Sequence, residues 1–298
     1  MAPLVGYFAP GLLDFEFLFG AVGPACFGET YFFFMKPKTF ALAILAGSNL
    51  ACSPSPEAKQ PPPKVCTMVL LPPTPQGPEK ITYLNGTRWQ PGQTLRVKFL
   101  GGNVFLQGKV RECSRQWFQH CHLKLEFVAK GDAEIRVHFL PSGRWSMVGR
   151  QSLTHSLNPT TLKPYRSSTG VTMNFDLTEA SPEIEIRGLV LHEFGHALGL
   201  VHEHQSPASG IAWQRDSVYA YYKRLKWTKK NVDDDILNRY VDTVTQFTAY
   251  DKLSIMNYPI PADLLTDASQ VVEWPNSLSA TDITFIGRIY PPPVLLPK

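Results

Sequence analysis

The run from His192 to His204, His-Glu-Phe-Gly-His-Ala-Leu-Gly-Leu-Val-His-Glu-His, constrains this chain more than any other stretch. On a helix, His192 and His196 stand about one turn apart, so both imidazoles leave the same face. That spacing suits two ligands of a tetrahedral zinc site. Gly199 is placed to end the helix, because glycine adopts positive φ without a Cβ penalty, and the turn brings His202 towards the same metal.

Glu193 follows the first of these histidines. It is placed beside the metal without binding it, as a general base on a zinc-bound water. The alternative is an ordinary amphipathic helix with half-buried or solvated histidines. Because Gly199 and His202 are both in phase with the H-E-x-x-H core, we favour a zinc site with His192, His196 and His202 as its ligands.

The residues around the motif predict that its helix is buried. Ser181 is expected to cap the helix, with Pro182 at its first position and Glu183 in its first turn. Apolar side chains surround almost the whole helix, namely Ile186, Leu189, Val190, Leu191, Phe194, Ala197 and Leu198. A buried helix that carries two histidines and a glutamate needs partners for these polar groups, and a metal ion provides them.

A second pattern, Ser254-Ile-Met256-Asn-Tyr258, follows later in the chain. Taken alone, it is consistent with a buried Met and Tyr before a turn ended by Pro259. Together with the histidine motif, it resembles the Met-turn of the metzincin clan of zinc metalloproteases, in which a tight turn places Met beneath the zinc-binding histidines. The chain resembles the astacin-like members of this clan, of the minimal microbial type, over roughly residues 80–292.

This resemblance implies a fold class and a reaction. The implied fold is α+β and metzincin or zincin-like, with a mixed twisted sheet, an active-site helix and a smaller C-terminal subdomain across the cleft. The implied activity is that of a secreted endopeptidase that hydrolyses protein or peptide substrates with Zn²⁺ as cofactor. Glu193 is the implied general base, and Tyr258 is implied to reach the zinc or the transition-state oxyanion. The family role of Glu203, which pairs with a mature N-terminus, stays open.

A non-catalytic zinc-binding or adhesion domain on the same fold is the alternative. Glu193 and Tyr258 argue against it, since binding alone requires neither. Other metzincin branches fit less well, because Tyr258 disfavours the matrixin type and the missing Gly-Gly-x-Gly-x-Asp repeats disfavour the serralysin type. His204 lacks metal-ligand spacing, and we interpret it as a non-ligand.

Hydrophobic patterning predicts the remaining elements. Strands are expected at 94–100, 123–128, 133–139 and 171–176, and helices at 104–119, at 216–226 and, capped by Ser279, near the C-terminal end. A short edge strand is expected at 145–149. The resemblance makes that edge a candidate for binding substrate backbone by strand addition.

The first 79 residues read as export and linker sequence. Residues 1–34 form an extension that we interpret as lying upstream of the true start at Met35, and residues 35–52 have the parts of a signal peptide. Two outcomes stay open at Cys52, namely cleavage with release or lipid attachment that anchors the protein at the cell surface. Residues 53–79 are Pro-rich and predict a linker, in which we recognise no cysteine-switch motif and therefore no support for a latent form.

The remaining boundaries and partners follow from composition. Residues 80–292 are expected to form the catalytic domain, and residues 293–298 a tail. Hydrophobic residues make up 44% of the chain, enough for a sizeable core, and the net charge of +4 is spread without a basic run. We therefore expect no nucleic-acid partner, a monomer, and membrane association only through Cys52. Pairing of Cys113 with Cys121 requires that the helix end before Cys121, and the disulfide connectivity stays open.

Overall fold

The computed structural model describes residues 66–69, 87–161, 163–240 and 249–293, all of which belong to one unit, residues 59–298. The predicted extension, the signal peptide with Cys52, most of the linker and most of the tail lie outside the described residues. A search of the described part of the chain finds no helix that is both long and apolar enough to cross a membrane.

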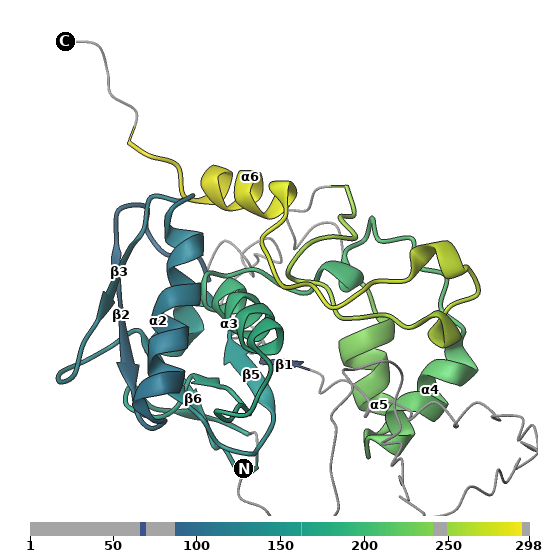
Figure 1. Ribbon diagram of the computed structural model, residues 1–298, viewed down its shortest axis with the longest axis horizontal. Coiled ribbons are helices and arrows are strands. Elements are labelled where there is room, and N and C mark those ends of the chain that lie inside the picture. The colour runs from purple at the N-terminus through teal and green to yellow at the C-terminus, as the bar shows by residue number, and fades with distance from the viewer. Residues whose placement is uncertain (1–65, 70–86, 162, 241–248, 294–298) are drawn as a thin grey trace, which may run out of the picture. The chain divides into compact units, whose positions relative to one another are not determined.

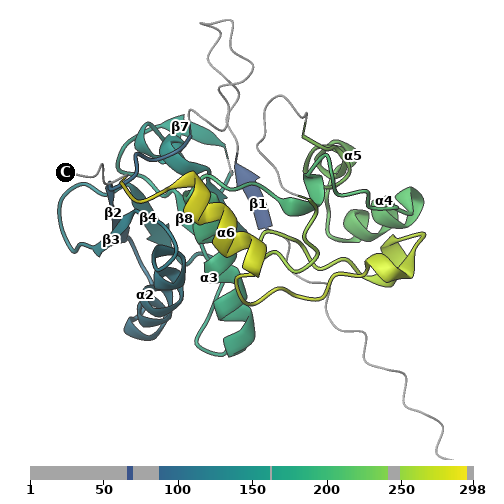
Figure 2. The same cartoon turned by 90° about the horizontal axis from the view of Figure 1, so that it is seen from above.

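Six strands form one mixed sheet in the order β1-β5-β8-β4-β2-β3, and Figures 1 and 2 together label all of them. The strands are β1 (Cys66–Val69), β2 (Thr94–Phe99), β3 (Lys124–Phe127), β4 (Ile135–His138), β5 (Arg144–Met147) and β8 (Met173–Asn174). Strand β5 runs antiparallel to β8, and the other neighbours are parallel. A separate hairpin consists of β6 (His155–Leu157) and β7 (Pro164–Arg166). The expected α+β class with a mixed sheet is confirmed.

Strand β1 lies within the stretch that the sequence predicts to be linker. It runs parallel to β5, from Cys66 opposite Arg144 to Val69 opposite Met147. The structure differs from the prediction because the prolines on either side dominate the composition of this stretch. The run Cys-Thr-Met-Val itself contains no proline, so its backbone N–H groups can donate hydrogen bonds to a neighbouring strand. As a result, β5 is not the edge strand expected at 145–149, since the chain's own residues cover its outer side.

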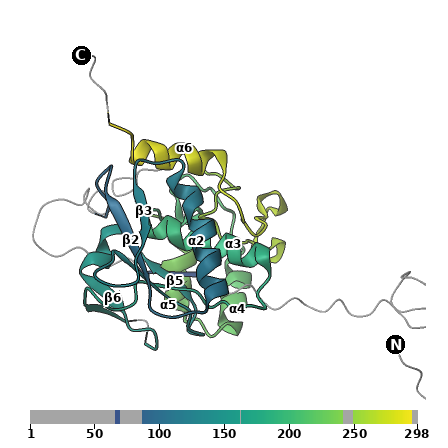
Figure 3. The ribbon, with the colours of Figure 1, turned by 60° about the vertical axis from the view of Figure 1, so that its left-hand side comes forward.

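Two helices, α2 (Val104–Phe118) and α3 (Glu183–Ala197), pack against each other beside the sheet (Figures 1 and 3). The predicted capping of α3 by Ser181 is wrong. Pro182 is the N-cap and gives no side-chain bond, and Ser181 Oγ instead accepts the N–H of Thr178 at 3.0 Å. The negative charges of Glu183 and Glu185 in the first turn interact favourably with the positive end of the helix dipole and so stabilise the start of α3.

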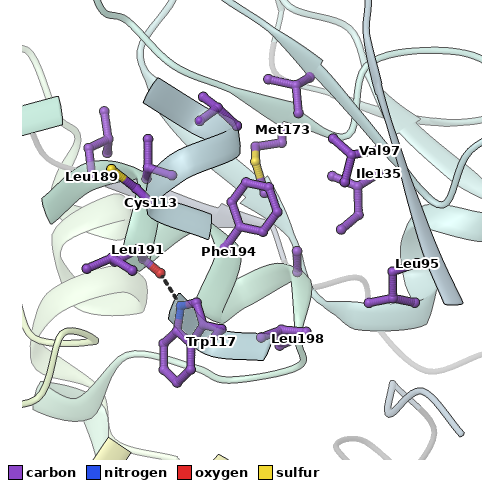
Figure 4. Packing of buried hydrophobic residues seen from close by; sticks show 14 of the residues in the cluster. Leu95, Val97, Cys113, Trp117, Ile135, Met173, Leu189, Leu191, Phe194 and Leu198 are labelled. Carbon is purple, nitrogen blue, oxygen red and sulfur yellow. Dashed lines mark hydrogen bonds between the residues drawn. The ribbon is translucent and has the colours of Figure 1, made fainter. Parts of the chain in front are cut away.

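The main core fills the space between the sheet and these two helices (Figure 4). Side chains of Val97 and Ile135 from the strands meet Phe194 of α3, and all three are essentially inaccessible to solvent. Trp117 of α2 is fully buried, and its indole N–H donates to the carbonyl of Leu191 at 2.8 Å. Burial of one such side chain contributes about 1.5–3 kcal/mol, so this packing fixes the position of α3.

The chain after His202 builds a smaller subdomain around a second hydrophobic cluster. Its regular elements are η2 (Glu203–Gln205), α4 (Arg215–Arg224), α5 (Lys229–Val232), the π-helical turn η3 (Asp233–Leu237), η4 (Ala262–Leu264) and η5 (Ala268–Gln270). A further short turn, η1 (Gly149–Leu153), follows β5. Helix α6 (Ala280–Ile289) returns to lie over α3 (Figure 2), and Ser279 caps it as predicted, in a capping box with Asp282.

Candidate metal centre

Helix α3 and the turn after it bring three histidines together. The ring centroids of His192 and His196 lie 4.8 Å apart, as expected for one helical turn. Gly199 has φ of +93°, which reverses the chain after the helix as the sequence predicts. The ring of His202 then lies 4.7 Å from that of His196 and 5.3 Å from that of His192.

Backbone carbonyls orient two of these rings. His192 Nδ1 lies 2.7 Å from the carbonyl oxygen of Ile255, and His196 Nδ1 lies 2.9 Å from that of Leu200. A carbonyl only accepts, so each Nδ1 carries the proton and each Nε2 keeps its lone pair. The Nε2 atoms of His196 and His202 face each other at 3.1 Å. Free lone pairs therefore converge, as metal ligation requires.

Cys66 of β1 is a fourth side chain at this point, and the sequence analysis missed it. The ligand atoms of Cys66, His192, His196 and His202 all lie within 4.8 Å of one another, and all four residues are buried. Burial raises the pKa of the Cys66 thiol well above its ordinary value, and Glu193 raises it further, against the opposing effect of Arg144. The available signal was a lone cysteine in a proline-free, strand-forming run.

The buried polar atoms of the centre fit a zinc ion. His192 Nε2 is buried without a hydrogen-bond partner among the described residues, and the carboxylate oxygens of Glu193 are buried with only the Cys66 thiol as a partner there. An unsatisfied buried polar atom costs about 1–3 kcal/mol, and more when it is charged, so these atoms require a partner. Three imidazole nitrogens with a thiol sulfur form a donor set that zinc prefers.

Glu193 lies beside the ligands and is completely buried. Burial raises the pKa of its carboxyl to about 8, although Cys66 and Arg144 act in the opposite direction. A cation in the centre favours the ionised carboxylate, because an opposite charge nearby lowers the pKa of an acid. The arrangement thus places a carboxylate with free lone pairs next to a cation site.

Tyr258 reaches the same place from the C-terminal subdomain. Its ring centroid lies 4.4 Å from that of His202 and 4.6 Å from that of His204. Its hydroxyl donates to the backbone carbonyl of Cys66. The predicted catalytic tyrosine is therefore next to the histidines, where it holds a peptide carbonyl of the chain itself.

Met256 lies beneath α3, as the Met-turn resemblance implies. A Cβ on Gly195 would overlap the sulfur of Met256, which explains a glycine inside the helix. The turn is held by Asp282, which accepts the Ser254 hydroxyl at 2.7 Å and the Ile255 N–H at 2.8 Å.

Two residues next to the third histidine have other partners. Glu203 accepts the N–H of Asp251 at 3.0 Å, and burial raises the pKa of its carboxyl to about 7. His204 Nε2 lies 3.0 Å from the carbonyl of Asp235, and burial lowers the pKa of the ring to about 4. His204 does not belong to the metal-binding group found in the described residues.

The described cysteines away from the centre are unpaired. Helix α2 ends at Phe118, before Cys121, yet Cys113 and Cys121 are both free. Burial raises the pKa of each thiol to about 11.

Comparison with known proteins identifies the family. No protein-family model and no curated protein matches the sequence. One structure of myroilysin is 35% identical, with a TM-score of 0.63, and the alignment covers 71% of this chain and 98% of that one. A second myroilysin structure is 36% identical, with a TM-score of 0.54, over 77% of this chain and 91% of that one.

A hatching enzyme zinc-protease of the medaka fish Oryzias latipes is a more distant match, at 16% identity over 69% of this chain and 95% of that one, with a TM-score of 0.45. Myroilysin is a bacterial astacin-like metalloprotease, and this chain covers nearly all of it at more than a third identity. With three convergent histidines on the matching fold, the chain belongs to the astacin-like zinc metalloproteases.

Proposed function

We propose that this chain is a secreted zinc-dependent endopeptidase in which His192, His196 and His202 hold the zinc and Glu193 is the general base. The observation that carries the proposal is the convergence of three buried imidazoles beside a buried carboxylate that has, among the described residues, no partner other than the Cys66 thiol. Bound zinc supplies Lewis-acid chemistry, since it acidifies water and polarises a carbonyl oxygen. The signal-like residues 35–52 support secretion.

Glu193 moves the proton. Apart from the Cys66 thiol, whose hydrogen bond lowers the pKa of the carboxyl, no described group pairs with its two oxygens. Once Cys66 has left, they are free to take a proton from the attacking water and pass it to the leaving amine. Its burial strengthens this role, because the absence of competing solvent keeps the transferred proton within the site.

Tyr258 holds the carbonyl oxygen of the scissile bond. Its present bond to the Cys66 carbonyl supports this role, because it demonstrates reach to a peptide carbonyl beside the histidines. A donor aimed at an oxygen that gains negative charge stabilises the transition state more than the ground state.

The segment Cys66–Val69 holds the enzyme in a latent form. A catalytic zinc site needs one open position, and the Cys66 sulfur, within 4.8 Å of the ligand atoms of all three histidines, is close enough to take it. The same segment pairs along β5, the strand expected to bind substrate, and its Cys66 carbonyl engages Tyr258. Activity therefore requires that Cys66–Val69 leave the site, either after cleavage of the chain between β1 and residue 87 or because loss of the sulfur ligand in Cys66→Ser weakens its hold enough to release it.

The function is tested with Glu193→Gln, made in a chain that also carries Cys66→Ser to relieve latency. Glu193→Gln should keep one zinc per chain and lose about 10²–10⁴-fold of its peptidase activity on casein. Glu183→Gln is the matched control, because Glu183 lies on the same helix but pairs with Lys109 at the surface. Zinc-dependent binding with no hydrolysis by any form would favour the non-catalytic alternative.

Latency is tested by replacing zinc with cobalt(II) in the full chain. A thiolate ligand gives a sulfur-to-cobalt charge-transfer band in the near ultraviolet, which the wild-type chain should have and Cys66→Ser should lack. Cys113→Ser is the control and should keep the band, because Cys113 lies in the main core. A wild-type chain without the band, or one as active as Cys66→Ser, would contradict the latent form.

A further inference from the structure

A cavity lies directly beside the metal centre and shares Cys66, His192 and Tyr258 with it. The rest of its wall comes mainly from large apolar and aromatic side chains of α3, α4, the Met-turn segment and the loop before α6, namely Leu189, Tyr221, Tyr222, Ile255, Pro259 and Trp274. Among the described residues that line it, none is an aspartate, glutamate, lysine or arginine. The cavity is therefore an apolar recess that opens next to the reacting atoms.

The wall at Trp274 is fixed in place. A Cβ on Gly188 would lie 2.6 Å from Trp274 Nε1 and 2.6 Å from the carbonyl oxygen of Pro275. Glycine inside a helix is destabilising, so its presence in α3 is explained by this close approach. The Arg144 guanidinium lies 5.7 Å from the Trp274 ring centroid, where it pairs with Glu185, and it does not line the cavity.

We infer that this cavity is the pocket that selects a large apolar side chain, such as leucine or phenylalanine, on a substrate residue flanking the scissile bond. The inference rests on the proposed endopeptidase function and names its substrate class. A scissile carbonyl held by Tyr258 brings the neighbouring side chain to the cavity, because Tyr258 and His192 belong to both.

Charge and hydration favour a large apolar side chain in this cavity over a charged one. A charged side chain that enters the recess loses its hydration and meets no opposite charge on the described wall. Two wall groups, the Tyr221 hydroxyl and the Trp274 indole N–H, are buried donors without a partner. The indole N–H only donates, and the hydroxyl is one neutral acceptor, so neither offers the negative charge that a buried lysine or arginine needs.

The test uses quenched fluorescent peptides that differ at one position, in one series before the scissile bond and in another after it. The wild-type chain and Cys66→Ser are both assayed, so that latency does not hide the result. In one series, leucine or phenylalanine should exceed alanine by about tenfold and aspartate or lysine by about a hundredfold in kcat/KM.

Three variants of the Cys66→Ser chain locate the selectivity. Trp274→Ala removes one wall and should reduce the preference over alanine to within about threefold. Trp274→Phe keeps an aromatic wall and should keep most of the preference. Phe118→Ala also removes a half-buried aromatic ring, but one packed against the main core, so the preference should not change. Circular dichroism checks that each variant is folded.

The outcomes separate this inference from the proposed function. A flat series, a preference for aspartate or lysine, or an unchanged ratio in folded Trp274→Ala would overturn the apolar pocket while leaving the endopeptidase intact. Failure to cleave every peptide and casein would contradict the endopeptidase itself.

Discussion

Asp282→Ala is expected to destabilise both the fold and the metal centre. The carboxylate is 6% exposed and accepts three hydrogen bonds, from the Ser254 hydroxyl at 2.7 Å, the Ile255 N–H at 2.8 Å and the Ser279 N–H at 2.9 Å. Hydrogen bonds to a charged group contribute about 1.5–3 kcal/mol each. Burial raises the pKa of Asp282 in spite of these bonds, so part of their sum is offset by desolvation.

We therefore expect a net loss of about 3–5 kcal/mol in the free energy of unfolding, because three donors lose their acceptor. For a domain of this size, the melting temperature falls by about 6–20 °C. Zinc affinity should fall as well, since the turn that Asp282 holds carries Met256, whose carbonyl accepts the N–H of Glu203 at 3.0 Å, directly after the third histidine.

The assay is thermal unfolding of the metal-free protein by circular dichroism, with zinc affinity from competition with a chelator. Asp267→Ala is the matched control. Asp267 also accepts a backbone N–H at the start of a short helix, but it is exposed. If Asp282→Ala melts within about 2 °C of Asp267→Ala, the view that Asp282 supports the turn is wrong.

Three further measurements probe the centre. Burial lowers the pKa of His204 from 6.5 to about 4, so between these pH values the unfolded chain binds a proton that the folded chain excludes, and stability falls as the pH drops from 6.5 to 4. In His204→Phe, the free energy of unfolding from urea titrations should fall by roughly 3 kcal/mol less between the two pH values than in the wild type, and an equal fall in both would refute this cause. Zinc at a thousandfold its Kd should add about 4 kcal/mol to the stability of the apo-protein, reversed by EDTA, whereas an unchanged melting temperature would speak against a metal site in the folded state. Gly199→Ala places a Cβ at φ of +93°, so it should lower the free energy of unfolding by about 1–2 kcal/mol and weaken zinc binding by displacing His202. An unchanged zinc affinity would show that the turn does not position that ligand.

Local spacing carries most of what the sequence predicts at the site. His192, Glu193 and His196 share one helix, and a single glycine sets the turn to His202, so the geometry follows from residues close together in the chain. The core strands and α2 follow for the same reason, because each is a periodic run long enough to recognise. The N-cap of α3 was misplaced by one residue because Ser181 bonds to the loop before it instead.

Long-range pairing is what the sequence does not reveal. Cys66 joins the centre only because β1 pairs with β5, and these two strands are far apart in the chain. A run of four residues is too short for its hydrophobic pattern to identify β5 as the neighbouring strand. Trp274 likewise lies at the cavity because it packs closely against Gly188 of α3. The sequence pattern gives no sign of that contact, since Gly188 occupies an ordinary position within the predicted helix. Apart from α4, which was expected at 216–226, the elements that follow His202 in the smaller subdomain are short turns with too few residues to show a period.

X-ray absorption at the zinc edge tests the central claim most directly. Zinc bound to the full chain should have three nitrogen scatterers from His192, His196 and His202 and one sulfur from Cys66. In Cys66→Ser the sulfur should be replaced by oxygen, and peptidase activity should appear in the same sample. A full-chain spectrum without sulfur, or with a six-oxygen shell in place of imidazole, would contradict the account.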